Sequence, residues 1–154
     1  MVPVKVTAKA DYAVRAMLEL ATVDEGLTKG ERIAQAQGIP LKFLENILID
    51  LRHAGLVHAQ RGAEGGYRLA RGAADVTLGE VIRAVEGPLA SVRGEPPESV
   101  TYNGAAENLQ TVWVAVRASL RSVLDDLTLA EVVAGRLPQR VRKLTEQPDA
   151  WARR

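Results

Sequence analysis

The stretch RGAEGGYRL, residues 61–69, places Gly62, Gly65 and Gly66 within five positions, between two apolar segments. Such a glycine density fits either a loop that cradles a nucleotide phosphate or the tip of a β-hairpin. A phosphate loop leads from a strand into a helix N-terminus, whose free N–H groups face the anion. Here both flanking segments, LVHAQ and GYRLA, read as short strands, and no Gly-Lys-Ser/Thr follows. The sequence therefore predicts a β-hairpin with a glycine-rich tip.

The residues before this hairpin have the apolar spacing of amphipathic helices. Apolar side chains recur at helical spacing over residues 7–22, where Thr7 is placed to cap the helix. Thr28 and Glu31 have the spacing of a capping box, in which each side chain bonds to the backbone N–H of the other residue. This spacing predicts a short second helix that ends near Gly38.

A third helix is predicted from Pro40 to Ala54, because proline suits a first helical turn and Gly55 suits the residue that follows a helix. Its apolar side chains form one stripe that we expect to face the core: Leu41, Leu44, Ile47, Leu48 and Leu51. Two helices joined by a short turn and followed at once by a hairpin have the order of a winged helix-turn-helix. The sequence thus predicts a mainly α fold with a small β-hairpin wing.

A second part of the chain follows the hairpin. Thr77 and Glu80 repeat the capping-box spacing and predict a helix that stops at Gly87. The next residues are rich in Pro, Gly and Ser, so we expect a loop over 88–108. A long helical stripe then follows: Leu109, Val112, Trp113, Val116, Leu120, Val123, Leu124 and Leu127. Such a stripe either packs on its own domain or pairs with the same helix of a second subunit, and we favour the second interpretation, a homodimer.

Four segments carry a resemblance to a known family: VTAKADYAVRAMLELA, IAQAQGIPLKFLENILIDLRHAGLVHAQRGAEGGYRLAR, VTLGEVIRAVEGPL and, more loosely, VWVAVRASLRSVLDDLTLAEV. Together they resemble the Rrf2 family of bacterial transcription regulators. The resemblance implies a homodimeric winged helix-turn-helix regulator whose long C-terminal helices cross at the dimer interface. It divides the chain into a winged helix-turn-helix DNA-binding domain (1–87), a loop (88–108), a dimerisation helix region (109–135) and a basic C-terminal tail (136–154).

The chain departs from the family in one chemical respect. Many relatives carry three cysteines in the loop before the dimerisation helix and use them to hold a redox-sensing iron–sulfur cluster. This chain has no cysteine at all, so thiolate metal sites, thiol nucleophiles and disulfides are excluded. We therefore expect no cofactor, and an effector, if one exists, to be an unknown small molecule or protein.

The third helix carries the residues that we expect to read bases. Its apolar stripe leaves Lys42, Glu45, Asn46 and also Asp50 on the exposed side. Lys can donate to guanine, Asn can pair bidentately with adenine, and Glu can accept from cytosine, so one strip offers base-edge chemistry. The alternative interpretation is an ordinary solvated helix face.

Further DNA contacts are implied by the resemblance. Arg61, beside the wing glycines, is expected to enter a narrow minor groove, and Tyr67 and Arg68 are expected to contact phosphates. For Tyr67, packing beneath the hairpin is an equal alternative. Lys9, near the start of the first helix, is a further candidate for a phosphate contact. The basic tail could also touch phosphates, although a solvated end is the interpretation that we favour.

Other classes of function find little support. The two histidines, His53 and His58, lack a nearby nucleophile and carboxylate, and the adjacent Asp125 and Asp126 point in different directions on a helix, so no enzyme is expected. The net charge of +1 is uninformative, and no apolar run is long enough to cross a membrane. We expect a cytoplasmic, sequence-specific DNA-binding repressor that acts as a homodimer on a pseudo-palindromic operator. The alternative is a winged-helix module that binds only protein.

Overall fold

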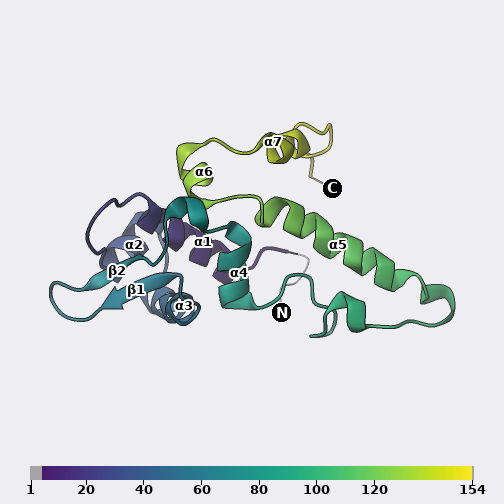
Figure 1. Ribbon diagram of the computed structural model, residues 1–154, viewed down its shortest axis with the longest axis horizontal. Helices are drawn as coiled ribbons and strands as arrows, with labels where there is room; N and C mark the ends of the chain where they lie inside the picture. Colours follow the sequence, from purple (N-terminus) through teal and green to yellow (C-terminus); the bar gives the residue numbers. More distant parts are fainter. Residues whose placement is uncertain (1–4, 154) are drawn as a thin grey trace.

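The protein is elongated, with a helical head at one end and a long helix that reaches away from it (Figure 1). The computed structural model describes residues 5–153, so residues 1–4 of the predicted first domain and Arg154 of the predicted tail lie outside the described part. The head contains α1 (Ala8–Ala21), α2 (Gly30–Gln37), α3 (Leu41–His53), β1 (Val57–Gln60), β2 (Gly66–Leu69) and α4 (Leu78–Glu86). The prediction of a mainly α fold with a small β-hairpin is confirmed.

Helix α1 forms the centre of the head. It starts as predicted at Thr7, whose hydroxyl accepts a hydrogen bond of 3.1 Å from the backbone N–H of Ala10. Its buried face packs against α2, α3, α4 and β2 and consists of Ala10, Ala13, Ala16, Met17 and Leu20. The small alanines on this face let neighbouring helices approach closely around a single core.

The turn between α2 and α3 uses the glycine and the proline that the sequence analysis placed there. Gly38 ends α2 in the left-handed conformation, at φ 63°, and Pro40 precedes the first residue of α3. The buried face of α3 consists of Leu44, Ile47, Leu48 and Leu51. Leu41, predicted to belong to this stripe, is exposed instead, because the turn of about 100° per residue places it at the edge of the buried arc.

The capping box predicted at Thr28 and Glu31 does not form. The backbone N–H of Thr28 donates to the carbonyl of Tyr67, and the N–H of Tyr67 donates back, both at 2.8 Å. Thr28 is therefore an extended residue paired with β2, and its N–H is no longer free to bond to Glu31. Helix α2 begins two residues later, at Gly30, with no side-chain cap.

Close backbone approach explains the glycines of the wing. In the antiparallel hairpin, Val57 pairs with Leu69 and Gln60 pairs with Gly66. A Cβ on Gly65 would lie 2.0 Å from the carbonyl oxygen of Gln60. A Cβ on Gly66 would lie 2.7 Å from the carbonyl oxygen of Thr28. Neither position has room for a side chain, because Gly65 lies against the end of β1 and Gly66 against the extended residue Thr28, as expected for a tightly packed hairpin.

The loop and the long helix follow α4, which begins with the predicted capping box of Thr77 and Glu80. Two short 3₁₀ turns, η2 (Pro97–Ser99) and η3 (Gly104–Ala106), lie in the loop, after η1 (Ala73–Asp75) near the hairpin. Helix α5 (Leu109–Leu124) has no buried residue along its 16 residues. It ends before Leu127, the last residue of the predicted stripe, which is buried in the turn that follows.

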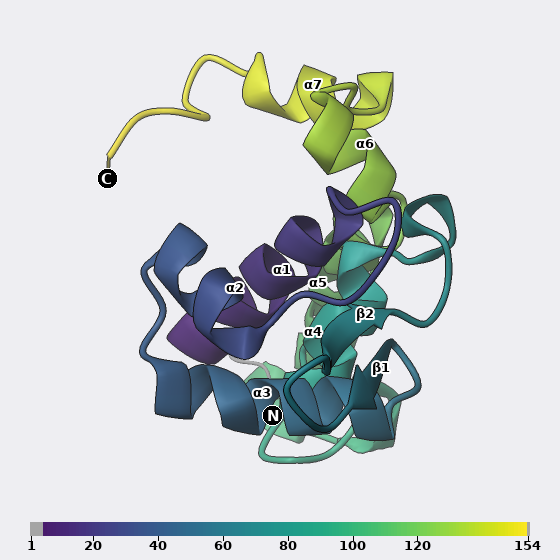
Figure 2. The same ribbon diagram turned by 90° about the vertical axis from the view of Figure 1, so that its left-hand side faces the viewer.

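The C-terminal region returns to the head (Figure 2). Helix α6 (Leu129–Ala134) begins with a capping box of Thr128 and Glu131 that the sequence analysis missed, and it packs against α1. Leu129 is fully buried in the core of the head. Residues 127–129 also bond to the head through their backbone, since the N–H of Leu129 donates to Val76 at 3.0 Å.

The segment interpreted as a basic, solvated tail contains a further helix, α7 (Gln139–Thr145), with Val141 buried. Figures 1 and 2 place α7 and α3 on opposite sides of the molecule. The basic residues Arg140, Arg142 and Lys143 therefore lie away from the helix expected to read bases.

Replacing Leu129 by Ala should lower the free energy of unfolding by about 2–5 kcal/mol, because a fully buried leucine leaves a cavity in the core. Urea unfolding followed by circular dichroism would measure the change. Leu144→Ala, at an exposed leucine of α7, is the matched control and should change stability little. Equal effects of the two substitutions would mean that α6 is not part of the core.

Candidate nucleic-acid interface

The face of α3 that points away from the core carries four side chains. Because the buried residues occupy one arc of the helix, the rotation of about 100° per residue places Lys42, Asn46, Ile49 and His53 on the opposite arc. All four are exposed, and Glu45 lies beside them on the flank nearer to the hairpin. The structure thus brings Lys42, Glu45 and Asn46 together on one strip, as predicted.

The other flank of α3 is occupied by contacts with α1. The rings of Tyr12 and Phe43 meet edge to face at 5.5 Å, and Lys9 Nζ lies 3.1 Å from Asp50 Oδ2. Asp50, expected on the exposed strip, is therefore half-buried and paired with Lys9. Lys9 itself helps to fix α1 on α3, which the sequence analysis did not foresee.

A groove of about 370 Å³ runs between α3 and the hairpin. Its charged lining consists of Lys29, Glu31, Glu45, Arg52 and Arg61. Lys29 Nζ donates to the carbonyl oxygen of Gly62 at 2.9 Å and so ties the tip of the hairpin to the start of α2. Three cations and two carboxylates therefore line the groove.

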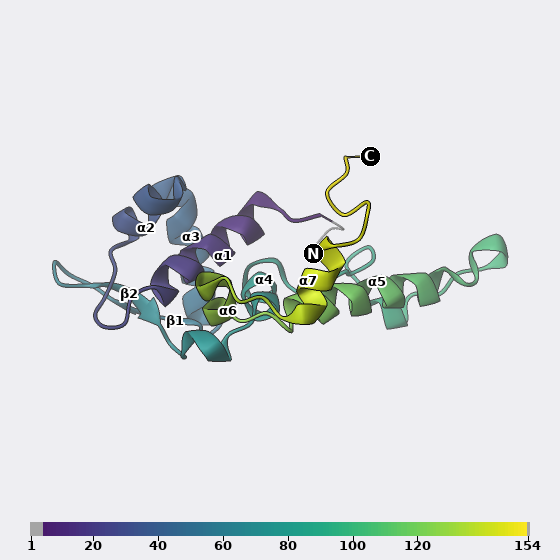
Figure 3. The same ribbon diagram turned by 90° about the horizontal axis from the view of Figure 1, so that it is seen from above.

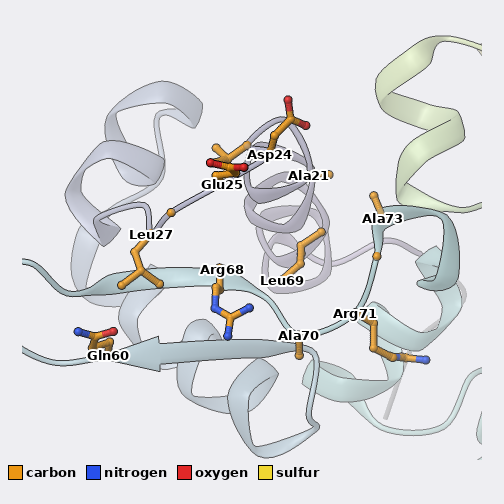
Figure 4. A pocket seen from close by; sticks show the side chains of 13 residues that line it. Ala21, Asp24, Glu25, Leu27, Gln60, Arg68, Leu69, Ala70, Arg71 and Ala73 are labelled. Carbon is orange, nitrogen blue, oxygen red and sulfur yellow. The ribbon is translucent and has the colours of Figure 1, made fainter.

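Two of the predicted wing contacts lie on different faces of the hairpin. Arg61 borders the groove beside α3. Arg68 pairs with His58 across the sheet and alternates with Tyr67, so it points to the opposite face. There it lies in a hollow of about 730 Å³ beside the loop after α1 (Figure 4). In this view Arg68 points towards β1 and Asp24 points away from it, so the charges do not converge on one position.

Tyr67 is a packing residue of the head. Its side chain is half-buried, and its Cε2 lies 3.6 Å from the position of a Cβ on Gly30. Its backbone carries both hydrogen bonds to Thr28. Tyr67 therefore packs beneath the hairpin, which is one of the two interpretations that the sequence left open.

Three residues of this surface were not identified from the sequence. Ile49 is apolar but 44% exposed, because it lies four residues after Glu45 on the same, otherwise polar, face of α3. A helical projection that excluded the leucine stripe would have found it and Arg52. Lys29 had no local signal, because the long-range pairing of Thr28 with Tyr67 places it beside the wing.

The ligand chemistry does not fit a thiolate-bound iron–sulfur cluster, since the chain has no cysteine. Over residues 5–153, the structure brings together no group of three or more His, Asp or Glu side chains that could hold a metal ion. Within the same range, no helix is both long and apolar enough to cross a bilayer.

Comparison with known sequences places the chain in a family. Residues 6–135 match the Rrf2 family, described as an iron-dependent transcriptional regulator. A candidate HTH-type transcriptional regulator of Mycobacterium tuberculosis is 48% identical over 143 residues, which cover 92% of this chain and 89% of that protein. The HTH-type transcriptional regulator CymR of Bacillus subtilis is 34% identical over 84% of this chain and 90% of that protein.

Comparison with solved structures agrees. The structure of CymR, named as the global cysteine regulator of B. subtilis, matches with a TM-score of 0.72 and 33% identity, over 88% of this chain and 98% of that one. The IscR of T. potens matches with a TM-score of 0.69 and 37% identity, over 85% of this chain and 87% of that one. The chain therefore belongs to the Rrf2 family and is a DNA-binding transcriptional regulator, not an enzyme.

Proposed function

We propose that this protein is a cytoplasmic, homodimeric repressor that binds a pseudo-palindromic operator. The observation that carries the proposal is the exposed polar strip of α3 beside a groove that Glu45, at the edge of the strip, and Arg61 of the hairpin both line. An α-helix fits the major groove of DNA, while a hairpin tip beside it can reach the adjacent minor groove.

Each side chain of the strip has a base partner of matching chemistry. Asn46 can pair bidentately with adenine, Lys42 can donate to guanine and Glu45 can accept from cytosine. Ile49 offers the apolar contact that a thymine methyl group favours. Arg52 and Lys29, at the edges of the groove, are placed to contact phosphates.

Arg61 is the wing residue that we propose for the minor groove, because it is exposed at the hairpin tip and lines the groove beside α3. Arg68 is directed away from this surface. Lys9 can add a phosphate contact only in competition with Asp50, its ion-pair partner.

Dimerisation is proposed through α5 because its apolar stripe stays partly exposed along the helix. None of its residues is buried, and Val112 is 49% exposed. The indole N–H of Trp113 donates to the hydroxyl of Tyr102 at 3.1 Å, so this polar group is satisfied and the ring can pack against an apolar surface. A second copy would cover the remaining members of the proposed interface: Leu109, Val116, Leu120, Val123 and Leu124.

In this proposal the DNA-binding part is residues 1–87 with α6 packed on it, the loop is 88–108, and the dimerisation region lies within 109–135. A thiolate-bound cluster has no part in the proposed regulation, because the chain has no cysteine to hold one. Any signal must act through a different group, either a small molecule or a protein.

Replacing Asn46 by Ala should cost about 1–3 kcal/mol of binding free energy on the cognate operator and relax the preference at one base position. Binding to random duplex should hardly change, since base contacts are lost and phosphate contacts remain. Fluorescence anisotropy with both DNAs measures the difference. Gln139→Ala, an exposed amide on α7, is the control. A loss of affinity that is equal on both DNAs would contradict base reading by Asn46.

Arg61 and Arg68 form a matched pair, since both are exposed arginines of the hairpin. Arg61→Ala should weaken operator binding and lower the slope of log affinity against log salt by about one, because one cation leaves the DNA. Arg68→Ala should leave the affinity and the slope near the wild-type values. Titrations at several salt concentrations distinguish them, and the reverse order would place the opposite face of the hairpin on DNA.

Replacing Leu120 by Asp should convert dimers into monomers, because a carboxylate would be buried in the apolar interface. Ala118→Asp, on the opposite side of α5, adds the same charge and should leave the dimer intact. Sedimentation velocity at micromolar concentration gives the mass of each variant. A wild-type protein that sediments as a monomer would show that the proposed dimer is wrong.

A further inference from the structure

We propose that Gly79 and Arg83 of α4 and Asp125 after α5 form a joint that sets the distance between the two α3 helices of the dimer. The joint would thereby select the spacing between operator half-sites. This inference rests on the proposed dimeric binding and adds positioning residues that do not touch DNA.

The joint is a two-point contact between the head and the end of α5. Arg83 Nη1 donates to Asp125 Oδ1 at 2.8 Å, and Arg83 Nη2 donates to Oδ2 at 2.7 Å. Both side chains are about one-third exposed, at 33% and 36%. Such a bidentate arrangement fixes the orientation of the carboxylate as well as its distance. The hydrogen bond from Arg83 also holds the pKa of Asp125 below its usual value.

The carboxylate of Asp125 packs directly against Gly79 of α4. A Cβ at this position would lie 1.9 Å from Asp125 Oδ1 and 3.0 Å from Arg83 Nη1. Gly79 is the second residue of α4, in the first turn, and glycine is a poorer helix former than alanine. The close approach of Asp125 supplies a reason for a glycine here.

The neighbouring contacts show that this end of α5 is its attachment point. Leu124, the last residue of α5, packs against the small cluster of Ala10, Ile82 and Leu89, and the backbone then bonds to residues 76–78 of the head. The rest of α5 extends away from the head (Figure 3). Over the residues that the structure describes, the Arg83–Asp125 pair is the ion pair that joins α4 to this end.

A lever of this length amplifies a small change at the joint. A helix of 16 residues is about 24 Å long. A rotation of roughly 10° at one end therefore moves the other by about 4 Å, close to the rise of one base pair. A joint that fixes the orientation of α5 thus determines which half-site spacing the dimer can span.

The experiment measures the affinity of the full-length protein for its selected operator and for operators with one or two base pairs added or removed between the half-sites. The wild type should favour one spacing. Gly79→Ala, which displaces the carboxylate, and Asp125→Asn, which keeps its size, should reduce that preference by about threefold to fivefold, the most that a partly exposed ion pair provides. Asp126→Asn, which removes the adjacent exposed charge, should not.

Two readouts separate positioning from a general loss of structure. Gly79→Ala should keep the wild-type melting temperature or raise it, since alanine is the better helix former, while dimer mass and affinity for random duplex stay unchanged. In the double variant Gly79→Ala/Asp125→Ala, the preference should match that of Asp125→Ala alone, because the added methyl group no longer meets a carboxylate.

A wild-type spacing preference that persists in Gly79→Ala and Asp125→Asn would overturn the joint and leave dimeric DNA binding intact. Additive effects in the double variant would also overturn it. If the wild type bound every spacing equally, the joint and the proposed dimeric binding would both be wrong.

Discussion

Two backbone hydrogen bonds between Thr28 and Tyr67 hold the wing against the helix-turn-helix, and the candidate interface depends on them. They bring Lys29 beside the hairpin tip, where its ammonium group bonds to Gly62. They also require glycine at position 66, because the strand passes too close for a Cβ. With the hairpin held in this way, Arg61 lines one groove with Glu45, Ile49 and Arg52 of α3.

The rest of the protein positions this candidate interface. The core around α1 fixes α3 through Leu44, Ile47, Leu48 and Leu51, and α6 completes the core with Leu129. Helix α5 leaves the head with no fully buried residue on its apolar stripe. In the proposed dimer, base chemistry on α3 determines which half-site is bound, and the attachment of α5 determines how far apart two half-sites lie.

Capping-box spacings in the sequence predict helix starts correctly only where the backbone N–H of the threonine has no other partner. Thr28, Thr77 and Thr128 each begin a Thr-x-x-Glu sequence that leads into a helix, and the last two form capping boxes. Thr77 and Thr128 face each other across a bridge whose hydrogen bonds use neighbouring residues, so their own N–H groups stay available to Glu80 and Glu131. The N–H of Thr28 bonds to Tyr67 instead, and its cap is lost. The difference depends on long-range pairing, which local spacing does not reveal.

The geometry of the candidate site could be predicted where it depends on a single helix, and not where it depends on contacts between elements. The strip of Lys42, Glu45 and Asn46 followed from the leucine stripe, because the rotation per residue alone defines both faces of a helix. The ion pair of Lys9 with Asp50 required the packing of α1 on α3. The separation of Arg61 from Arg68 required the register of the hairpin, since a shift by one residue exchanges the two faces.

The most direct test of the account is a selection of binding sites by the wild-type protein from a pool of random duplexes. The account predicts a consensus of two inverted half-sites whose centres are separated by whole helical turns of roughly 10 base pairs, because a two-fold dimer presents two copies of α3 on one side of the DNA. A single asymmetric site, or a pool without any consensus, would contradict it.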